Sequence, residues 1–236
     1  MKRKIALLAL LAVFAAIAAS GTIAYFTSET HAHNVITSGG IDIEIRETME
    51  KEKEDGTGTE IVEFVNNQTG IMPSTSLSKI VEIKNLQEKA WIRVKLGIGI
   101  QKVGTSGDSP MPEVNTLDTT ITVNGKEEEL IQLMFDDSKL STLKTIEADP
   151  ATADFRWIYH DGYWYCIDPV EMNDMTGELF TRVYFNEKMG NEYQNCTVFI
   201  DVDAEAVQYA NNNTIEGTDT VIEYLTVDNL SNIKGW

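Results

Sequence analysis

The stretch from Trp91 to Gln101 limits the possible folds of this chain more than any other. Aliphatic residues occupy every second position in it, and polar residues or glycines fill the positions between them. A period of two is that of a β-strand, because successive side chains point to opposite faces of a sheet. The stretch therefore predicts a central core strand, with these residues on its buried face: Ile92, Val94, Leu96, Ile98 and Ile100.

Other stretches alternate in the same way or lie between turn residues, and they predict nine or ten short strands in all. The turn pairs Asn124-Gly125 and Asp161-Gly162 are typical of tight hairpins. Helical spacing predicts short helices at 127–135 and 204–210. The pattern predicts an all-β fold, a jelly-roll-like antiparallel β-sandwich with short helical insertions, as one domain over residues 39–236. The expected strands are 41–45, 60–65, 77–84, 91–101, 119–123, 155–159, 163–167, 178–185 and 195–202, with 221–227 as an edge strand.

The first 24 residues have the pattern of an export signal peptide. A basic start precedes an unbroken apolar run from Ile5 to Ala19, which is shorter than the roughly 20 residues of a membrane-spanning helix. Small residues at Thr22 and Ala24 fit the signal peptidase and would leave Tyr25 as the mature N-terminus, although Ala16 and Ala18 also fit. We therefore expect a secreted protein that is not membrane-bound once mature.

The chain is strongly acidic, with a formal charge of −18. Removal of the signal peptide leaves 16 basic against 37 acidic residues, or −21. Such a surface repels phosphate backbones and anionic lipids, so no nucleic-acid or membrane partner is expected. A solvated surface explains the acidity; the alternative is loosely held divalent cations. Asp201, Asp203 and Glu205 form the best local acidic run, but it lacks the glycine and closing glutamate of a calcium loop.

Cys166 and Cys196 are the two cysteines, and an exported protein permits a disulfide between them. Both lie in predicted strands, and alternation places Cys196 on the core-facing side with Val198 and Ile200. The sequence leaves two alternatives open: a disulfide, or two buried free thiols.

Motifs of the common enzyme classes are missing from the sequence, including His-Glu-x-x-His and Gly-x-Ser-x-Gly. The three histidines are His31, His33 and His160, whereas a hydrolytic zinc typically needs three protein ligands and an open position. We predict no catalytic residues, no cofactor and no metal site, with metal binding at His31 and His33 as the alternative. His160 fits an ordinary hairpin residue.

Five aromatic residues surround the predicted hairpin at His160-Asp161-Gly162. They fit either a carbohydrate-stacking platform or ordinary cross-strand pairs that stabilise a sheet. The five are Trp157, Tyr159, Tyr163, Trp164 and Tyr165.

Three blocks of the sequence resemble the TasA/camelysin family, whose members carry a SipW-type signal peptide. The resemblance departs from the family at Ser74, where glycine tends to follow the proline. It implies cleavage between Ala24 and Tyr25 by a dedicated signal peptidase, and biofilm-matrix fibres built through the processed N-terminus. The blocks are Gly21-Thr22-Ile23-Ala24-Tyr25-Phe26-Thr27 with Asn34 and Gly40-Ile41-Asp42-Ile43; Pro73–Leu77 with Trp91-Ile92-Arg93-Val94; and Met189-Gly190-Asn191-Glu192-Tyr193-Gln194-Asn195 with 204–208.

Residues 25–38 form a candidate donor strand, an arm that Ser38-Gly39-Gly40 joins flexibly to the body. A freed extended arm can add to an exposed sheet edge of a neighbouring copy, and this head-to-tail contact does not close on itself. The alternative is that the arm pairs within its own domain or stays disordered. The arm residues expected to fill the neighbour's groove are Tyr25, Phe26, Ala32, Val35 and Ile36.

The expected function is that of a secreted structural protein, a subunit of extracellular biofilm-matrix fibres of a Gram-positive-type bacterium, in the matrix or at the cell surface. Its expected partners are further copies of itself and related matrix proteins. The alternatives are a camelysin-like surface metalloendopeptidase and a monomeric cell-surface adhesin.

Overall fold

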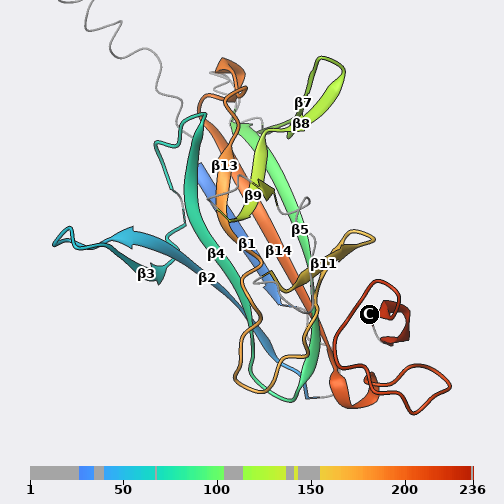
Figure 1. The fold of residues 1–236 in the computed structure, drawn as a ribbon. Coiled ribbons are helices and arrows are strands. Elements are labelled where there is room, and N and C mark those ends of the chain that lie inside the picture. Colours follow the sequence, from blue (N-terminus) through green and yellow to red (C-terminus); the bar gives the residue numbers. More distant parts are fainter. Residues whose placement is uncertain are drawn as a thin grey trace, which may run out of the picture.

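Two six-stranded β-sheets and a two-stranded ribbon make up the computed structural model, which describes residues 27–34, 40–66, 68–103, 114–136, 141–142, 155–234 and 236 (Figure 1). The first sheet, sheet A, has the order β1 (Thr27–Asn34), β14 (Cys196–Gln208), β5 (Ala90–Val103), β12 (Tyr163–Cys166) and β11 (Trp157–His160), with β6 (Val114–Leu117) also beside β5. Sheet B has the order β10 (Ser141–Thr142), β9 (Ile131–Asp136), β13 (Phe180–Phe185), β4 (Thr75–Asn85), β2 (Ile43–Glu52) and β3 (Thr59–Glu63). The ribbon pairs β7 (Thr120–Val123) with β8 (Lys126–Glu129).

The all-β prediction is confirmed, because the described residues contain strands and three short 3₁₀ turns but no α-helix. The 3₁₀ turns are η2 (Asn191–Tyr193), η3 (Tyr209–Asn211) and η4 (Leu230–Asn232). Within the two sheets the strand pairs are antiparallel, apart from the parallel pair of β1 and β14. The jelly-roll connectivity stays a prediction.

The main core lies between the two sheets, where alternate residues of the long strands turn their side chains inward. The predicted core strand is β5, and its Ile92, Val94 and Ile100 are fully buried. Burying a large aliphatic or aromatic side chain contributes roughly 1.5–3 kcal/mol, so this row is a major source of stability. Sheet B faces this row with Val81 and Ile83 from β4 and with Phe180 and Phe185 from β13. The neighbour of β5 within sheet A, β14, adds Val198, Ile200 and Val202.

A second, smaller core covers one end of the outer face of sheet A. Trp91 and Val207 lie on that outer face but are buried, because residues 209–236 fold over them. The Trp91 Nε1–H donates a hydrogen bond to the Asn212 carbonyl at 3.0 Å. The C-terminal segment therefore acts as a cover (lower right in Figure 1), and its buried residues are Ile222, Leu225, Leu230 and Ile233.

Both predicted helices are wrong. Residues 127–135 form parts of β8 and β9, with Leu130 at the corner between them: its N–H donates to the Thr119 carbonyl, and its own carbonyl accepts from Asn186. At this corner the alternation of buried and exposed positions shifts by one residue. The buried positions therefore have the spacing of one face of a helix: Leu130, Ile131, Leu133 and Met134.

Residues 204–210 continue β14 as far as Gln208 and then form a 3₁₀ turn. Ala206 is buried in the main core and Val207 under the C-terminal cover. Both faces of the strand are therefore apolar there, and the alternation that marks a strand is lost. The predicted edge strand at 221–227 is also wrong, since that segment contains one isolated bridge, between Thr214 and Val221, and otherwise turns.

The two predicted hairpin turns are present between β7 and β8 and between β11 and β12. Asn124 and Gly125 have φ of 52° and 79°, and Asp161 and Gly162 have φ of 46° and 86°. Two consecutive positive φ angles define the type I′ turn, whose twist matches that of the flanking strands.

Ser74, the departure from the family pattern, has a φ of 64°. Its N–H donates to the Phe185 carbonyl at 2.8 Å, which fixes the entry of the chain into β4. A left-handed conformation costs a residue with a Cβ roughly 1–2 kcal/mol, whereas glycine adopts it freely.

We expect Ser74→Gly to raise the free energy of unfolding by about 0.5–1 kcal/mol, because relief of the backbone strain exceeds the added entropy of the unfolded chain. Urea denaturation of the mature protein measures the change. Ser76→Gly, two residues further inside β4, is the matched control and should lower stability; equal effects at both positions would show that Ser74 is not strained.

Candidate functional site

The N-terminal arm lies along the edge of sheet A as strand β1, parallel to β14. The register is continuous over eight pairs, from Thr27 opposite Thr197 to Asn34 opposite Ala204. The arm therefore pairs within its own chain, which is one of the alternatives that the sequence left open. The contact makes β14 an inner strand, flanked by β1 on one side and β5 on the other.

Ala32 is the one predicted groove-filling residue that the structure describes, and it lies opposite the fully buried Val202. The other four, Tyr25, Phe26, Val35 and Ile36, lie outside the described residues, as do Ala24 and the predicted signal peptide.

The body of the domain begins immediately after Gly40, which has a φ of 79°. Ile41 is buried in the main core, and the Asp42 carbonyl accepts a hydrogen bond from the Leu86 N–H at 2.8 Å. The next strand, β2, belongs to sheet B, so the chain passes from one sheet to the other between β1 and β2. One short connection therefore links the arm to the body.

The outer side of β14 is open and polar along its middle. Asp201 and Asp203 are half-buried, and the β1 residues opposite them are His31 and His33. On the other flank, Asp201 lies opposite Gly97 of β5, and Phe199 opposite Gly99. The Phe199 ring covers Gly99 so closely that a Cβ there would lie 2.0 Å from its Cζ.

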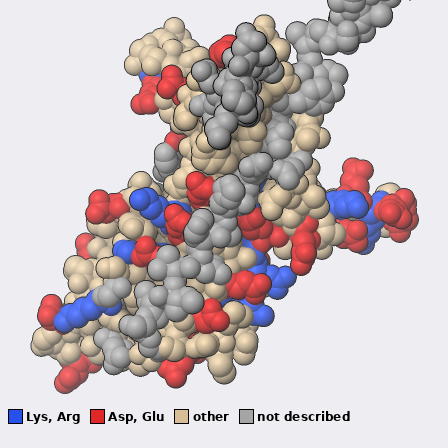
Figure 2. Space-filling view, turned by 180° about the vertical axis from the view of Figure 1, so that it is seen from behind, with Lys and Arg blue, Asp and Glu red and all other residues tan. Residues whose placement is uncertain are grey.

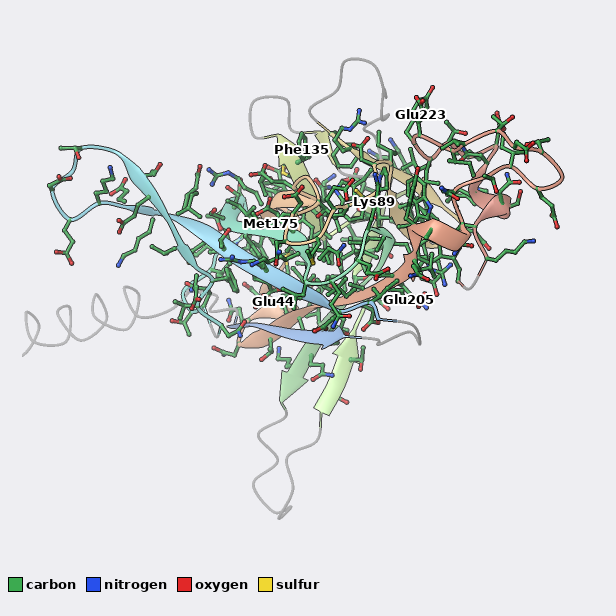
Figure 3. All side chains as sticks on the ribbon, turned by 90° about the horizontal axis from the view of Figure 1, so that it is seen from below. Glu44, Lys89, Phe135, Met175, Glu205 and Glu223 are labelled. Atoms are coloured by element: carbon green, nitrogen blue, oxygen red, sulfur yellow. The ribbon has the colours of Figure 1, made fainter. Side chains whose placement is uncertain are left out.

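Glu205, the third member of the acidic run, is engaged in an ion pair. The Arg93 Nε–H donates to Glu205 Oε2 at 2.8 Å, and the Arg93 guanidinium also lies over the Tyr163 and Trp236 rings at 4.0 and 4.6 Å. Figure 3 shows Glu205 among the side chains along β14, away from Glu223 on the C-terminal cover. Among the side chains that the structure describes, no group of three His, Cys, Asp or Glu is arranged to hold a metal ion.

Acidic side chains are spread over the face seen in Figure 2, with lysines and arginines between them. This distribution agrees with a solvated acidic surface more than with one concentrated cation site. The tip of the projecting β2–β3 hairpin carries both signs of charge.

The five hairpin aromatics are mostly buried, as sheet-stabilising side chains are. Trp157, Trp164 and Tyr165 expose at most 6% of their surface, while Tyr159 exposes 49%. The Trp157 Nε1–H donates to the Gly177 carbonyl, and Tyr165 packs edge-on against Trp236. A stacking platform needs several open ring faces, whereas three of these five rings are buried.

A cavity of about 280 Å³ opens beside this hairpin, between β5 of sheet A and β9 of sheet B. Its walls are mainly apolar and include one carboxylate, that of Glu129. Tyr159, Gly162 and Trp164 supply the hairpin side. The remaining lining residues are Leu96, Ile98, Thr119, Thr120, Ile131 and Leu133.

His160 lies in β11 opposite Tyr163 and is exposed, at the entrance to the hairpin turn. This position is that of an ordinary hairpin residue.

A buried ion pair that our sequence analysis missed joins β4 and β2 of sheet B. The Lys79 ammonium, which is fully buried, is 2.8 Å from Glu47 Oε1 and 4.0 Å from the centre of the Phe64 ring. Burial lowers the pKa of Lys79, and the Glu47 carboxylate partly offsets this. The sequence signal was available, since Lys79 shares the alternating face of Leu77, Val81 and Ile83.

The two cysteines are free and buried, so the structure contains the second of the two alternatives, without a disulfide. Tyr165, next to Cys166, pairs with Arg93, whereas Cys196 pairs with Lys102, nine residues further along β5. This separation is about 30 Å, against a Cα–Cα limit of about 7 Å for a disulfide. Burial raises the pKa of the Cys166 thiol to about 12.

Comparison of the chain with protein-family models, curated proteins and solved structures gave no match. In the described part of the chain, no helix is both long enough and apolar enough to cross a bilayer.

We expect Glu47→Gln to lower the free energy of unfolding by about 2–3 kcal/mol, because it leaves the buried ammonium without a counter-charge. This is less than the roughly 3–5 kcal/mol of a fully buried pair, since the Glu47 side chain is 15% exposed. Urea denaturation at neutral pH measures the loss. Because the pKa of Lys79 is lowered in the folded chain, stability should recover as the pH rises toward the ordinary value of 10.5.

The control for this pair is the double variant Lys79→Met with Glu47→Leu, which removes both charges together. It should be more stable than Glu47→Gln alone. A Glu47→Gln protein with unchanged stability would show that the carboxylate does not compensate the ammonium.

We expect a thiol-reactive disulfide reagent to titrate two thiols per chain in denaturant and almost none in the native protein. The reason is that the reactive species is the thiolate, which burial suppresses at Cys166 and Cys196. Absence of thiols in denatured, unreduced protein would instead demonstrate a disulfide.

Proposed function

We propose that this protein is a secreted structural subunit, a sandwich of jelly-roll type that assembles into extracellular fibres by exchanging β1 between copies. The observation that carries the proposal is the parallel pairing of β1 with β14 at the edge of sheet A. The resemblance to the TasA/camelysin family supports the same function.

Exchange of β1 conserves the contacts that the arm makes. A second copy has the same β1 sequence, so it can offer β14 the same backbone donors and acceptors over the eight paired positions. Each body would then receive one arm and donate one arm. Such a head-to-tail contact is heterologous, and it propagates as a filament unless the rotation closes a ring.

The position of the arm in the chain makes the exchange simple. β1 is at the sheet edge, its neighbour within the sheet is β14 alone, and the body starts independently at Ile41. Removing β1 leaves the eight paired residues of β14 as an open strand edge, which favours pairing with another chain.

Pairing of β1 with β14 of its own chain competes with pairing to β14 of a neighbouring copy, and the protein concentration decides between them. A tethered arm has an effective concentration in the millimolar range, so dilute protein favours the closed monomer. Release of the arm by a signal peptidase after Ala24, together with a high local concentration at the cell surface, would favour the filament. Further copies and related matrix proteins are the partners that this mechanism requires.

The deciding experiment compares mature protein beginning at Tyr25 with a version beginning at Gly39. We expect filaments from the first and monomers from the second, measured by negative-stain electron microscopy and sedimentation velocity. Thr30→Pro should prevent filaments in the full-length arm because proline removes an N–H and does not fit a paired strand, whereas Thr30→Val should form them. Filaments from the version beginning at Gly39 would disprove the role of the arm.

Cysteines placed at a register pair distinguish exchange from simple stacking. Thr27 and Thr197 are partners, so cysteines at both positions lie within reach of a disulfide. After oxidation of filaments, exchanged arms give a covalent ladder of multimers in a denaturing gel. A single covalent monomer band would show that every arm remains on its own body.

A further inference from the structure

We propose that the cavity between β5 and β9 is a binding site for a small organic cation, in which an aromatic ring carries a primary ammonium group. The cavity has a volume of about 280 Å³, and its lining also includes the β7–β8 ribbon and the β11–β12 hairpin. None of the described lining residues belongs to β1 or β14. The inference is therefore independent of the proposed function, which involves the pairing of those two strands.

The cavity coincides with a gap in the packing of the central strand β5. Val94 and Ile100 are fully buried in the main core. Leu96 and Ile98 lie between them on the same side of the strand, but they are only half-buried, and both line the cavity. The ring of a ligand would cover the apolar surface that these two side chains leave open, and this burial favours binding.

The opposite walls of the cavity are apolar as well. Sheet B contributes Ile131 and Leu133, and the hairpin contributes Tyr159 and Trp164. The two aromatic residues are register partners, with ring centroids 5.0 Å apart. Trp164 is buried, whereas Tyr159 is 49% exposed and so marks the side on which the cavity opens. Aromatic rings pack favourably against a further ring, edge-on or offset, so this wall suits an aromatic ligand.

The volume of the cavity limits the size of the ligand. An apolar cavity of about 150 Å³ binds benzene. At about 280 Å³ the present cavity is nearly twice as large, so it accommodates a benzene ring with a short side chain, or a fused pair of rings. Oligosaccharides and long acyl chains are too large for it.

The charge of the cavity favours a cation. Thr120 and Glu129 are register partners in the ribbon, so their side chains are on the same face of it. Glu129 is half-buried, and it is the one charged residue among the described residues that line the cavity. Beside apolar walls the effective dielectric constant is lower than in water, which strengthens the attraction of an ammonium group and the repulsion of an anion.

The polar groups also provide enough acceptors for an ammonium group, which has three donors. Glu129 has a further interaction within its own chain. An ionised carboxylate offers about four acceptor positions, so it can accept from a ligand in addition. Thr119 and Thr120, which also line the cavity, supply two hydroxyl oxygens.

The test is titration of the mature protein with phenethylamine, measured by calorimetry and by tryptophan fluorescence. We expect saturable binding of one molecule per chain. Phenethyl alcohol has nearly the same shape but no charge, so it should bind about 10-fold more weakly. Phenylacetate should bind more weakly than both, because its carboxylate is repelled by that of Glu129.

Substitutions of charge test the role of Glu129. Glu129→Gln keeps the shape of the side chain and removes its charge, so it should weaken the binding of phenethylamine about 10-fold and leave that of phenethyl alcohol unchanged. The matched control is Glu127→Gln, which makes the same change in net charge at an exposed position outside the lining. It should bind phenethylamine as the unmodified protein does.

Substitutions of volume test whether the ligand occupies the cavity. Ile98→Phe fills the cavity from sheet A and should abolish the binding of both phenethylamine and phenethyl alcohol. Thr120→Phe fills it from the ribbon and should have the same effect, so the test remains available if one of the two variants does not fold. Thermal unfolding without ligand shows which variants are folded.

Absence of phenethylamine binding by the unmodified protein, or equal binding of phenethylamine and phenylacetate, would overturn the inference. Unchanged binding by a folded Ile98→Phe or Thr120→Phe protein would do so too, because the ligand would then lie elsewhere. Equal effects of Glu129→Gln and Glu127→Gln would show that the preference for a cation comes from the net charge of the protein and that Glu129 does not hold the ligand.

Discussion

The antiparallel ladder between β5 and β14 is the constraint on which the rest of the structure depends. It runs without a break from Ala90 opposite Gln208 to Lys102 opposite Cys196. A ladder of this length fixes the phase of alternation in both strands, because a shift by one residue would move every core side chain to the outer face. That phase decides which side chains of β5 and β14 face the main core and which face the C-terminal cover. The same ladder leaves the other edge of β14 open to β1.

The outer surface of this ladder changes character along its length. At one end Trp91 and Val207 are apolar and require the C-terminal cover. In the middle, Gly97 and Gly99 provide no side chains, so the Phe199 ring lies close over Gly99 and the Asp201 side chain lies beside Gly97. The acidic centre and the apolar end therefore belong to the same two strands.

Strands with one apolar face and one polar face could be predicted from the sequence. The strand 91–101 and the Asn124-Gly125 and Asp161-Gly162 turns were predictable because alternation and positive φ leave local signals. Residues 127–135 and 204–210 were assigned wrongly since both faces are covered there, or the phase shifts at Leu130. In those places the local period carries no information about the strand.

Of the candidate site, the flexible N-terminal arm was predictable from the sequence, whereas the strand with which it pairs in its own chain was not. The partner of a parallel edge strand is set by the three-dimensional order of the sheet, and no local pattern in 27–34 specifies β14. The buried Lys79 shows the reverse case. Its place on an apolar face was visible in the sequence, and only the position of Glu47 across the strand pair explains why that face tolerates a cation.

The separation of the two buried thiols has a consequence for how this chain matures. Because Cys166 and Cys196 lie far apart along β5, the fold closes through packing and strand pairing, without any oxidation step. The protein can therefore reach its native state whether its surroundings are reducing or oxidising, and it needs no disulfide-forming catalyst to do so.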